Sequence, residues 1–167
     1  FPTINFFKNP AGAPTKPAAS LSIGSRNLEG RCLSLDGDLL VHPFDFRQLV
    51  STQENRIGVT PVNSNHPVFA GINNRGECDS FSMEQKSPWE WTGLVNFSPK
   101  DIPESRGNVF EMMQPLLPTP VVHVRTVEVD TLEDLEKASA AWFSMMKDIC
   151  RKETHHGFAK NRSFLAG

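Results

Sequence analysis

The sequence lacks tyrosine and contains only three cysteines, so polar aromatic groups and cross-linking thiols are both scarce. Twelve phenylalanines and three tryptophans make its aromatic content almost wholly apolar, which favours burial in a core. The cysteines are far apart, and none has the CxxC or Cys–His spacing of a structural zinc site. We therefore predict no metal and no cofactor. Free thiols in a reducing intracellular compartment are the simplest account, and one disulfide with one free cysteine stays open.

Long apolar runs and a strong net charge are also missing. No run approaches the ~20 apolar residues that span a bilayer, so we predict no membrane association. A formal net charge of −2 provides no whole-protein attraction to nucleic acid. The Walker loop, the dinucleotide fingerprint, HExxH and Gly-x-Ser-x-Gly are absent from the sequence. The enzyme classes that these motifs mark are therefore unsupported.

What is present suits one globular domain. A chain of 167 residues with 38% hydrophobic and 22% charged residues is long enough to bury a core. Residues 1–20 hold four prolines and no acidic residue, which predicts an extended arm. Residues 21–153 are predicted to form a single α+β domain, and residues 154–167 a mildly basic tail.

The stretch CLSLDGDLLVHPFD contains the pattern most suggestive of chemistry. Asp36 and Gly37 separate two apolar runs, which is the signal for a two-residue β-hairpin with positive φ angles. The residues after Asp38 are apolar rather than further oxygen ligands, so we predict a turn and no metal loop. The hairpin register predicts the facing pairs Leu35–Asp38, Leu33–Leu40 and Cys32–Val41.

The rest of the pattern predicts several strands and a final helix. The segment FDFRQLVSTQ fits a short helix, and VVHVRTVEV is the clearest strand. A helix is expected from Asp130 to about Lys152, opened by a capping box with Glu133. Its apolar stripe is Leu132, Leu135, Ser139, Trp142, Met146 and Ile149. The predicted fold is α+β, a largely antiparallel sheet with this C-terminal amphipathic helix packed on one face.

Two sets of residues are candidates for binding. Ile4, Phe6 and Phe7 form an apolar patch on the N-terminal arm and are expected to dock on this domain or on a neighbouring chain. Trp89 and Trp91 are two apart on a predicted strand, so they share one face and form either a binding platform or a cover for the core.

The polar residues converge on no known catalytic spacing. We therefore expect a non-enzymatic structural or protein-interaction module, such as an accessory or surface domain of a larger assembly like a viral coat. It would self-associate or bind a protein through its arm, with at most weak nucleic-acid contact by the basic tail. The alternative is a small cysteine-dependent hydrolase or transferase that pairs Cys78 with His66, His123 or His42.

Overall fold

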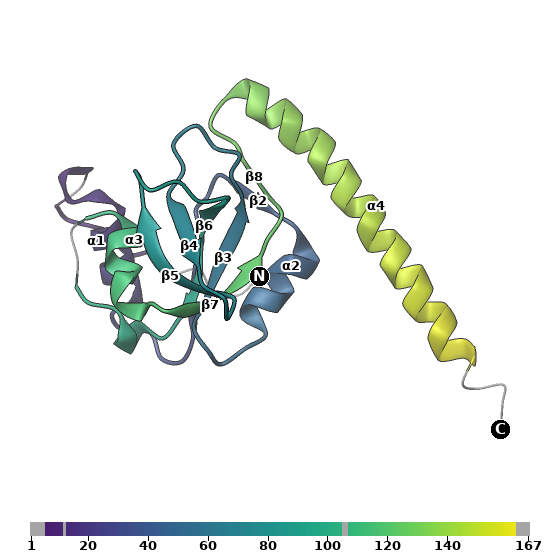
Figure 1. Cartoon of the computed structure of the whole chain (residues 1–167), viewed down its shortest axis with the longest axis horizontal. Helices are drawn as coiled ribbons and strands as arrows, with labels where there is room; N and C mark the ends of the chain where they lie inside the picture. Colours follow the sequence, from purple (N-terminus) through teal and green to yellow (C-terminus); the bar gives the residue numbers. More distant parts are fainter. Residues whose placement is uncertain (1–5, 12, 105–106, 163–167) are drawn as a thin grey trace.

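The computed structural model describes residues 6–11, 13–104 and 107–162, and it is an α+β fold built around a β-barrel (Figure 1). The six strands of its main sheet lie in the order β1-β6-β3-β7-β5-β4. They are β1 (Cys32–Ser34), β3 (Arg56–Pro61), β4 (Phe69–Ile72), β5 (Glu77–Ser82), β6 (Trp89–Phe97) and β7 (Thr119–His123). None of the helices in the described part is both long and apolar enough to span a membrane.

The sheet differs from the prediction in two respects. It is mixed, because β3 and β7 run parallel, with Ile57 opposite Val121. It also closes on itself, because β4 pairs with β5 and, through Phe69 and Glu90, with β6. The α+β class is confirmed, whereas the largely antiparallel sheet is corrected to a mixed barrel. The sequence pattern predicts strands from their local composition, but it does not specify which strands distant in sequence pair with each other.

The predicted hairpin at Asp36-Gly37 is wrong. β1 pairs with β6, and the following strand β2 (Leu39–Val41) pairs with β8 (Thr126–Glu128) in a separate two-stranded sheet. Gly37 has no positive φ, so the type I′ turn does not form. The predicted partners are therefore apart: Leu33 faces Asn96, and Leu40 faces Val127. Strands distant in sequence outcompete the local pairing, and the segment crosses from one sheet to the other.

The valine-rich run predicted as one strand is two strands, β7 and β8. Val124 and Arg125 separate them, and the Val124 amide donates to the Val59 carbonyl at 2.8 Å. β7 contributes to the barrel, while β8 leaves it to pair with β2. This break directs the chain after Arg125 to the outside of the barrel.

Three short helices pack near the barrel: α1 (Lys16–Ser25), α2 (Pro43–Val50) and α3 (Val109–Met113). α1 lies partly within the segment predicted to be extended, and its Ala18 is fully buried in the main core with Val59, Phe97 and Met112. α2 confirms the short helix predicted after His42. A capping box between Asn108 and Glu111 starts α3.

The last helix, α4 (Leu132–Arg162), forms a long rod that extends away from the barrel (Figure 1). Its cap is Thr131 with Asp134, whose side chains bond each other's amides at 3.2 and 3.1 Å, one residue later than predicted. Among the α4 side chains whose burial the structure describes, those of residues 132–148, Ala138 and Met145 are buried. The predicted packing of the apolar stripe on the sheet is therefore wrong, because Leu132, Leu135, Trp142 and Met146 are exposed.

Candidate acidic site

Three carboxylates meet at one end of the two-stranded sheet. Asp38 precedes β2, Glu128 ends β8, and Asp130 follows it. One carboxylate oxygen of each lies within 4.8 Å of those of the others. All three side chains are exposed and accessible to a ligand. We refer to these residues as the acidic cluster.

The β2–β8 ladder creates the cluster. Leu39 faces Glu128, and the Val129 amide donates to the Asp38 carbonyl at 2.9 Å, so the two backbones remain paired where the carboxylates emerge. Leu39 and Val41 pack against a small core that contains Leu49, Leu94 and Val124. The apolar residues after Asp38 therefore anchor a strand that holds an acidic residue at its start.

The local electrostatics disfavour three negative charges together. Partial burial, followed by the charges of Asp130 and Asp38, raises the pKa of Glu128. Partial burial and the charge of Asp38 likewise raise the pKa of Asp36, which lies beside the cluster. A bound cation would relieve this repulsion, and oxygen ligands are those that Mg²⁺ and Ca²⁺ prefer. The donor set of the acidic cluster therefore fits a hard divalent cation.

The acidic cluster opens onto neighbouring cavities. One of about 580 Å³ is lined by Glu128, Asp130 and Lys137. A second, of about 190 Å³, shares Glu128 and also touches Asp38 and Asp36. A third, of about 490 Å³, adjoins Asp36 on a side lined by Lys16, Trp91 and Phe110. The cavities share lining residues and therefore lie next to one another around the carboxylates. Together we call them the groove, and its lining includes positive and aromatic groups as well as acids.

Glu90 shapes the wall of this groove. It is 4% exposed, and its carboxylate accepts the amides of Asn63 at 3.1 Å and Ser64 at 3.2 Å, together with the Ser64 hydroxyl at 2.7 Å. Asn63 and Ser64 line two of the cavities. Because a buried carboxylate needs such donors, Glu90 fixes the position of the loop that faces the acidic cluster.

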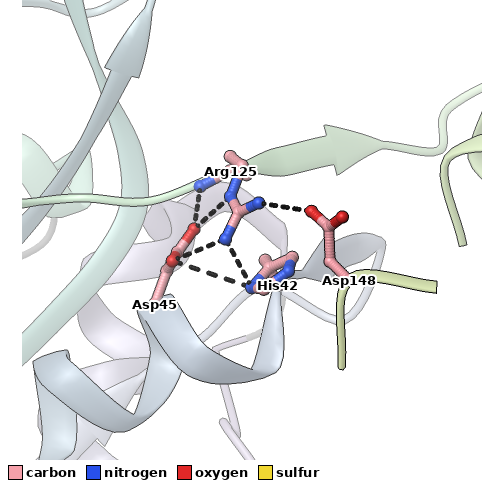
Figure 2. A network of polar contacts seen from close by, with 4 residues as sticks. All are labelled: His42, Asp45, Arg125 and Asp148. Atoms are coloured by element: carbon pink, nitrogen blue, oxygen red, sulfur yellow. Dashed lines mark hydrogen bonds and ion pairs between the residues drawn. The ribbon is translucent and has the colours of Figure 1, made fainter. Parts of the chain in front are cut away.

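A second polar network holds the chain just before β8 (Figure 2). The Arg125 guanidinium donates to both oxygens of Asp45, through Nε at 2.8 Å and Nη2 at 3.0 Å. It also contacts His42 Nδ1 at 2.9 Å and Asp148 Oδ2 at 3.2 Å. Burial alone raises the pKa of Asp45, but the hydrogen bonds and charge of Arg125 outweigh it and lower that pKa. The network ties α2, the β7–β8 junction and α4 together, so it positions β8.

The candidate nucleophile Cys78 does not suit catalysis. It is fully buried in the barrel core, its thiol donates to the Ser80 carbonyl at 3.4 Å, and burial raises its pKa to about 11. His123 packs against Trp89 with ring centroids 4.4 Å apart and the ring planes tilted by 55°, His66 lines the groove, and His42 belongs to the Arg125 network. A catalytic cysteine needs a low pKa and an accessible sulfur, and Cys78 has neither.

The two predicted sets of binding residues differ in burial: the arm phenylalanines are exposed, whereas the tryptophans pack against the core. Phe6 is 92% and Phe7 52% exposed, and Ile4 lies outside the described residues. Trp89 and Trp91 both pack against the main core, and Trp91 also lines the groove beside Asp36. The tryptophans therefore cover the core, while the described part of the arm leaves its phenylalanines uncovered.

The sequence does not reveal the acidic cluster, because its members come from distant segments. Asp36, Gly37 and Asp38 stand out as a turn signal, whereas Glu128 lies at the end of a predicted strand and Asp130 is the predicted helix cap. One feature of the sequence points to the cluster: an acidic residue stands at one end of each of two apolar runs, DGDLLV and TVEVD. It becomes informative only once those runs are known to pair.

No protein-family model matches the chain, and no curated protein matches it in sequence. Solved structures share its fold. HddC from Yersinia pseudotuberculosis is 12% identical with a TM-score of 0.55, over 78% of this chain and 64% of HddC, and its complex with GMP-PN gives the same values. A Bacillus anthracis protein described as a glucose-1-phosphate thymidylyltransferase, in complex with sucrose, is 15% identical with a TM-score of 0.57, over 75% of this chain and 60% of that one. The chain thus spans less than two thirds of these proteins.

Proposed function

We propose that this chain forms the cation-binding part of a nucleotidyltransferase-like enzyme. The observation that carries the proposal is the acidic cluster of Asp38, Glu128 and Asp130 at the mouth of a groove. Mg²⁺ in phosphate-transfer sites is commonly held by one or two carboxylates together with substrate phosphates. The fold shared with the protein described as a glucose-1-phosphate thymidylyltransferase supports the same class of reaction.

The proposed substrates are a nucleoside triphosphate and a phosphorylated sugar. In such a transfer, an acceptor phosphate oxygen forms a bond to the α-phosphorus, the bond from that phosphorus to the bridging oxygen breaks, and pyrophosphate leaves. A bound Mg²⁺ would neutralise phosphate charge. Asp38, Glu128 and Asp130 would hold the cation. Lys137, whose ammonium pairs with Glu133 at 3.0 Å and Asp134 at 3.4 Å, lines the same cavity. Asn63 and Ser64, fixed by Glu90, would confine the substrate on the opposite wall.

Cation binding tests the proposal directly. We expect calorimetric titration to show Mg²⁺ or Mn²⁺ binding that Asp130→Asn weakens at least about tenfold, since one ligand is lost. Glu84→Gln, at an exposed acid after β5, is the matched control and should bind like the wild type. Tryptophan fluorescence should report a nucleoside triphosphate that binds more tightly with Mg²⁺ than without it. Equal cation binding by the wild type and Asp130→Asn would refute the site.

A protein-interaction module is the second candidate function. One observation favours it: Phe6 and Phe7 are exposed, and such aromatic groups are frequent anchors at interfaces. Replacing both with Ser should leave thermal stability unchanged and abolish any arm-dependent association. A lower melting temperature in that variant would instead show that the arm docks on its own domain.

A further inference from the structure

The cavity of about 490 Å³ beside Asp36 differs from the rest of the groove in the chemistry of its walls. Most of the residues that line it are apolar or aromatic, with Trp91, Phe110 and Met83 among them. Its volume falls in the range of pockets that hold small organic ligands, about 300–1,000 Å³. We call it the aromatic cavity.

The aromatic walls of this cavity are held in place by the fold. Trp91 Nε1 donates to the Leu94 carbonyl at 3.2 Å, and the Trp91 ring packs against Phe81 with centroids 5.4 Å apart. Phe110 lies in α3 and packs against the main core. Because these rings are already ordered, a ring-shaped ligand can contact them at little further cost in side-chain entropy.

Lys16 brings a positive charge to the same cavity from a strained backbone position. Among the described residues it is the one non-glycine residue with a positive φ, +58°. Residues with a side chain rarely adopt this left-handed conformation, and such strain is concentrated at sites that bind ligands. Lys16 is exposed, and it and Asp36 are the two charged residues that line the aromatic cavity. Positive charge is therefore available at its mouth for an anionic group.

The aromatic cavity adjoins the space in front of the acidic cluster. Asp36, Trp91 and Gly93 line both this cavity and the one of about 190 Å³, which also touches Asp38. Gly93 has a φ of +78°, and a Cβ there would collide with the Asp36 carboxylate, so the glycine leaves room for that carboxylate at the boundary. A ligand whose ring fills the aromatic cavity can therefore extend a charged group toward the cluster.

We propose that the aromatic cavity binds a phosphate ester whose organic part presents an apolar ring face. The ring lies against Trp91 and Phe110, and the phosphate lies at the mouth, where Lys16 offsets its charge. A nucleobase and the ring of an acceptor both have this chemistry. Assigning the ligand as a substrate rests on the proposed function, whereas binding of the ring does not require the cation.

Calorimetric titration of the full chain in EDTA, with phenyl phosphate and with inorganic phosphate, tests the aromatic walls. We expect phenyl phosphate to bind at least about tenfold more tightly, because its ring alone contacts the apolar lining. Met83→Ser should reduce this preference by roughly threefold, since an exposed part of the wall is lost. Leu28→Ser, at a comparably exposed apolar residue outside the cavity, is the matched control. Equal binding of the two ligands by the wild type would overturn the proposal.

Lys16→Gly separates binding from stability. Glycine adopts a φ of +58° readily, so the variant should be at least as stable as the wild type in urea unfolding. It should nevertheless bind phenyl phosphate roughly five- to tenfold more weakly, because a charged hydrogen-bond donor is lost. Lys100→Gly, at an exposed lysine of η2 (Pro99–Asp101), is the control and should bind like the wild type. Unchanged affinity in Lys16→Gly would overturn the placement of the phosphate.

Competition in the presence of Mg²⁺ identifies the source of the ring. Displacement of phenyl phosphate more effectively by ATP than by glucose 1-phosphate assigns the cavity to the nucleobase, and the reverse order assigns it to the acceptor. Displacement by neither would overturn the assignment as a substrate pocket. Asp130→Asn should keep its affinity for phenyl phosphate in EDTA, so a failure of the cation site is distinguishable from a failure of the aromatic cavity.

Discussion

Replacing Arg125 with Met tests whether the polar network holds β8 in place. The side chain of Asp45 is 12% exposed, and Arg125 supplies its bidentate partner. Removing one member of a buried ion pair costs about 3–5 kcal/mol, because the other charge stays buried. The Arg125 side chain is 50% exposed, so screening reduces the expected cost to roughly 2–3 kcal/mol. For a domain of this size, that corresponds to a melting temperature lower by roughly 5–10 °C.

Urea unfolding at several pH values gives a sharper measurement. The folded-state pKa of Asp45 is lowered, so its stabilising contribution is present above the unfolded value of about 3.9 and is lost as pH falls through the lowered pKa. In Arg125→Met, the pKa of Asp45 is no longer lowered by Arg125, and burial favours the protonated form of its carboxyl group. The difference in unfolding free energy between wild type and variant should therefore be largest near neutral pH and shrink below about pH 4.

Two results would contradict this reasoning. One is an unfolding free energy for Arg125→Met equal to that of Arg75→Met, an exposed arginine in the β4–β5 turn that serves as the matched control. The other is a stability difference that stays constant across the acidic range. Asp45→Asn should abolish most of the effect of Arg125→Met in a double-mutant cycle, because the two replacements remove the same interaction.

Three further predictions concern the groove and the core. Glu128→Gln should raise thermal stability slightly in the absence of divalent cations, by at most ~1 kcal/mol because the group is exposed. The same replacement should reduce the stabilisation by added Mg²⁺. A variant that is less stable than the wild type without cation would refute the charge repulsion. Gly93→Ala should cost at least about 1 kcal/mol in urea unfolding, because φ is +78° and a Cβ would collide with the Asp36 carboxylate, whereas Gly37→Ala should be nearly neutral. Cys78 should resist alkylation by iodoacetamide in the native state and react on unfolding, and rapid native modification at neutral pH would contradict its burial and raised pKa.

Local patterns in the sequence identified individual elements but not their partners. The strand β6 follows from its aromatic and β-branched residues, and α2 from its amphipathic run after His42. The pairing of β1 with β6 and of β2 with β8 depends on long-range competition, and the Asp36-Gly37 dipeptide favoured a local hairpin that does not form. The periodicity of the α4 sequence predicts an apolar stripe, but it does not say which neighbour that stripe contacts.

The acidic cluster was unpredictable for the same reason. Asp38 is adjacent to Glu128 and Asp130 only through the β2–β8 ladder, and no spacing within either segment resembles a ligand set. The sequence predicts no metal loop at Asp36–Asp38, because such a loop supplies its ligands at close, regular spacing within one segment. A site divided between two strands leaves no such trace.

The β2–β8 ladder also bears on the order of events in folding. It joins a strand near the start of the domain to one near its end, and five of the six strands of the main sheet lie between them in sequence. Closing a loop of that length costs conformational entropy, and the three-residue ladder by itself offsets only a small part of that cost. The barrel strands are joined by shorter loops and larger apolar contacts, so they should form first and bring the two ends together. The carboxylates would then be assembled late, and a collapsed intermediate would contain the barrel without a place for a cation.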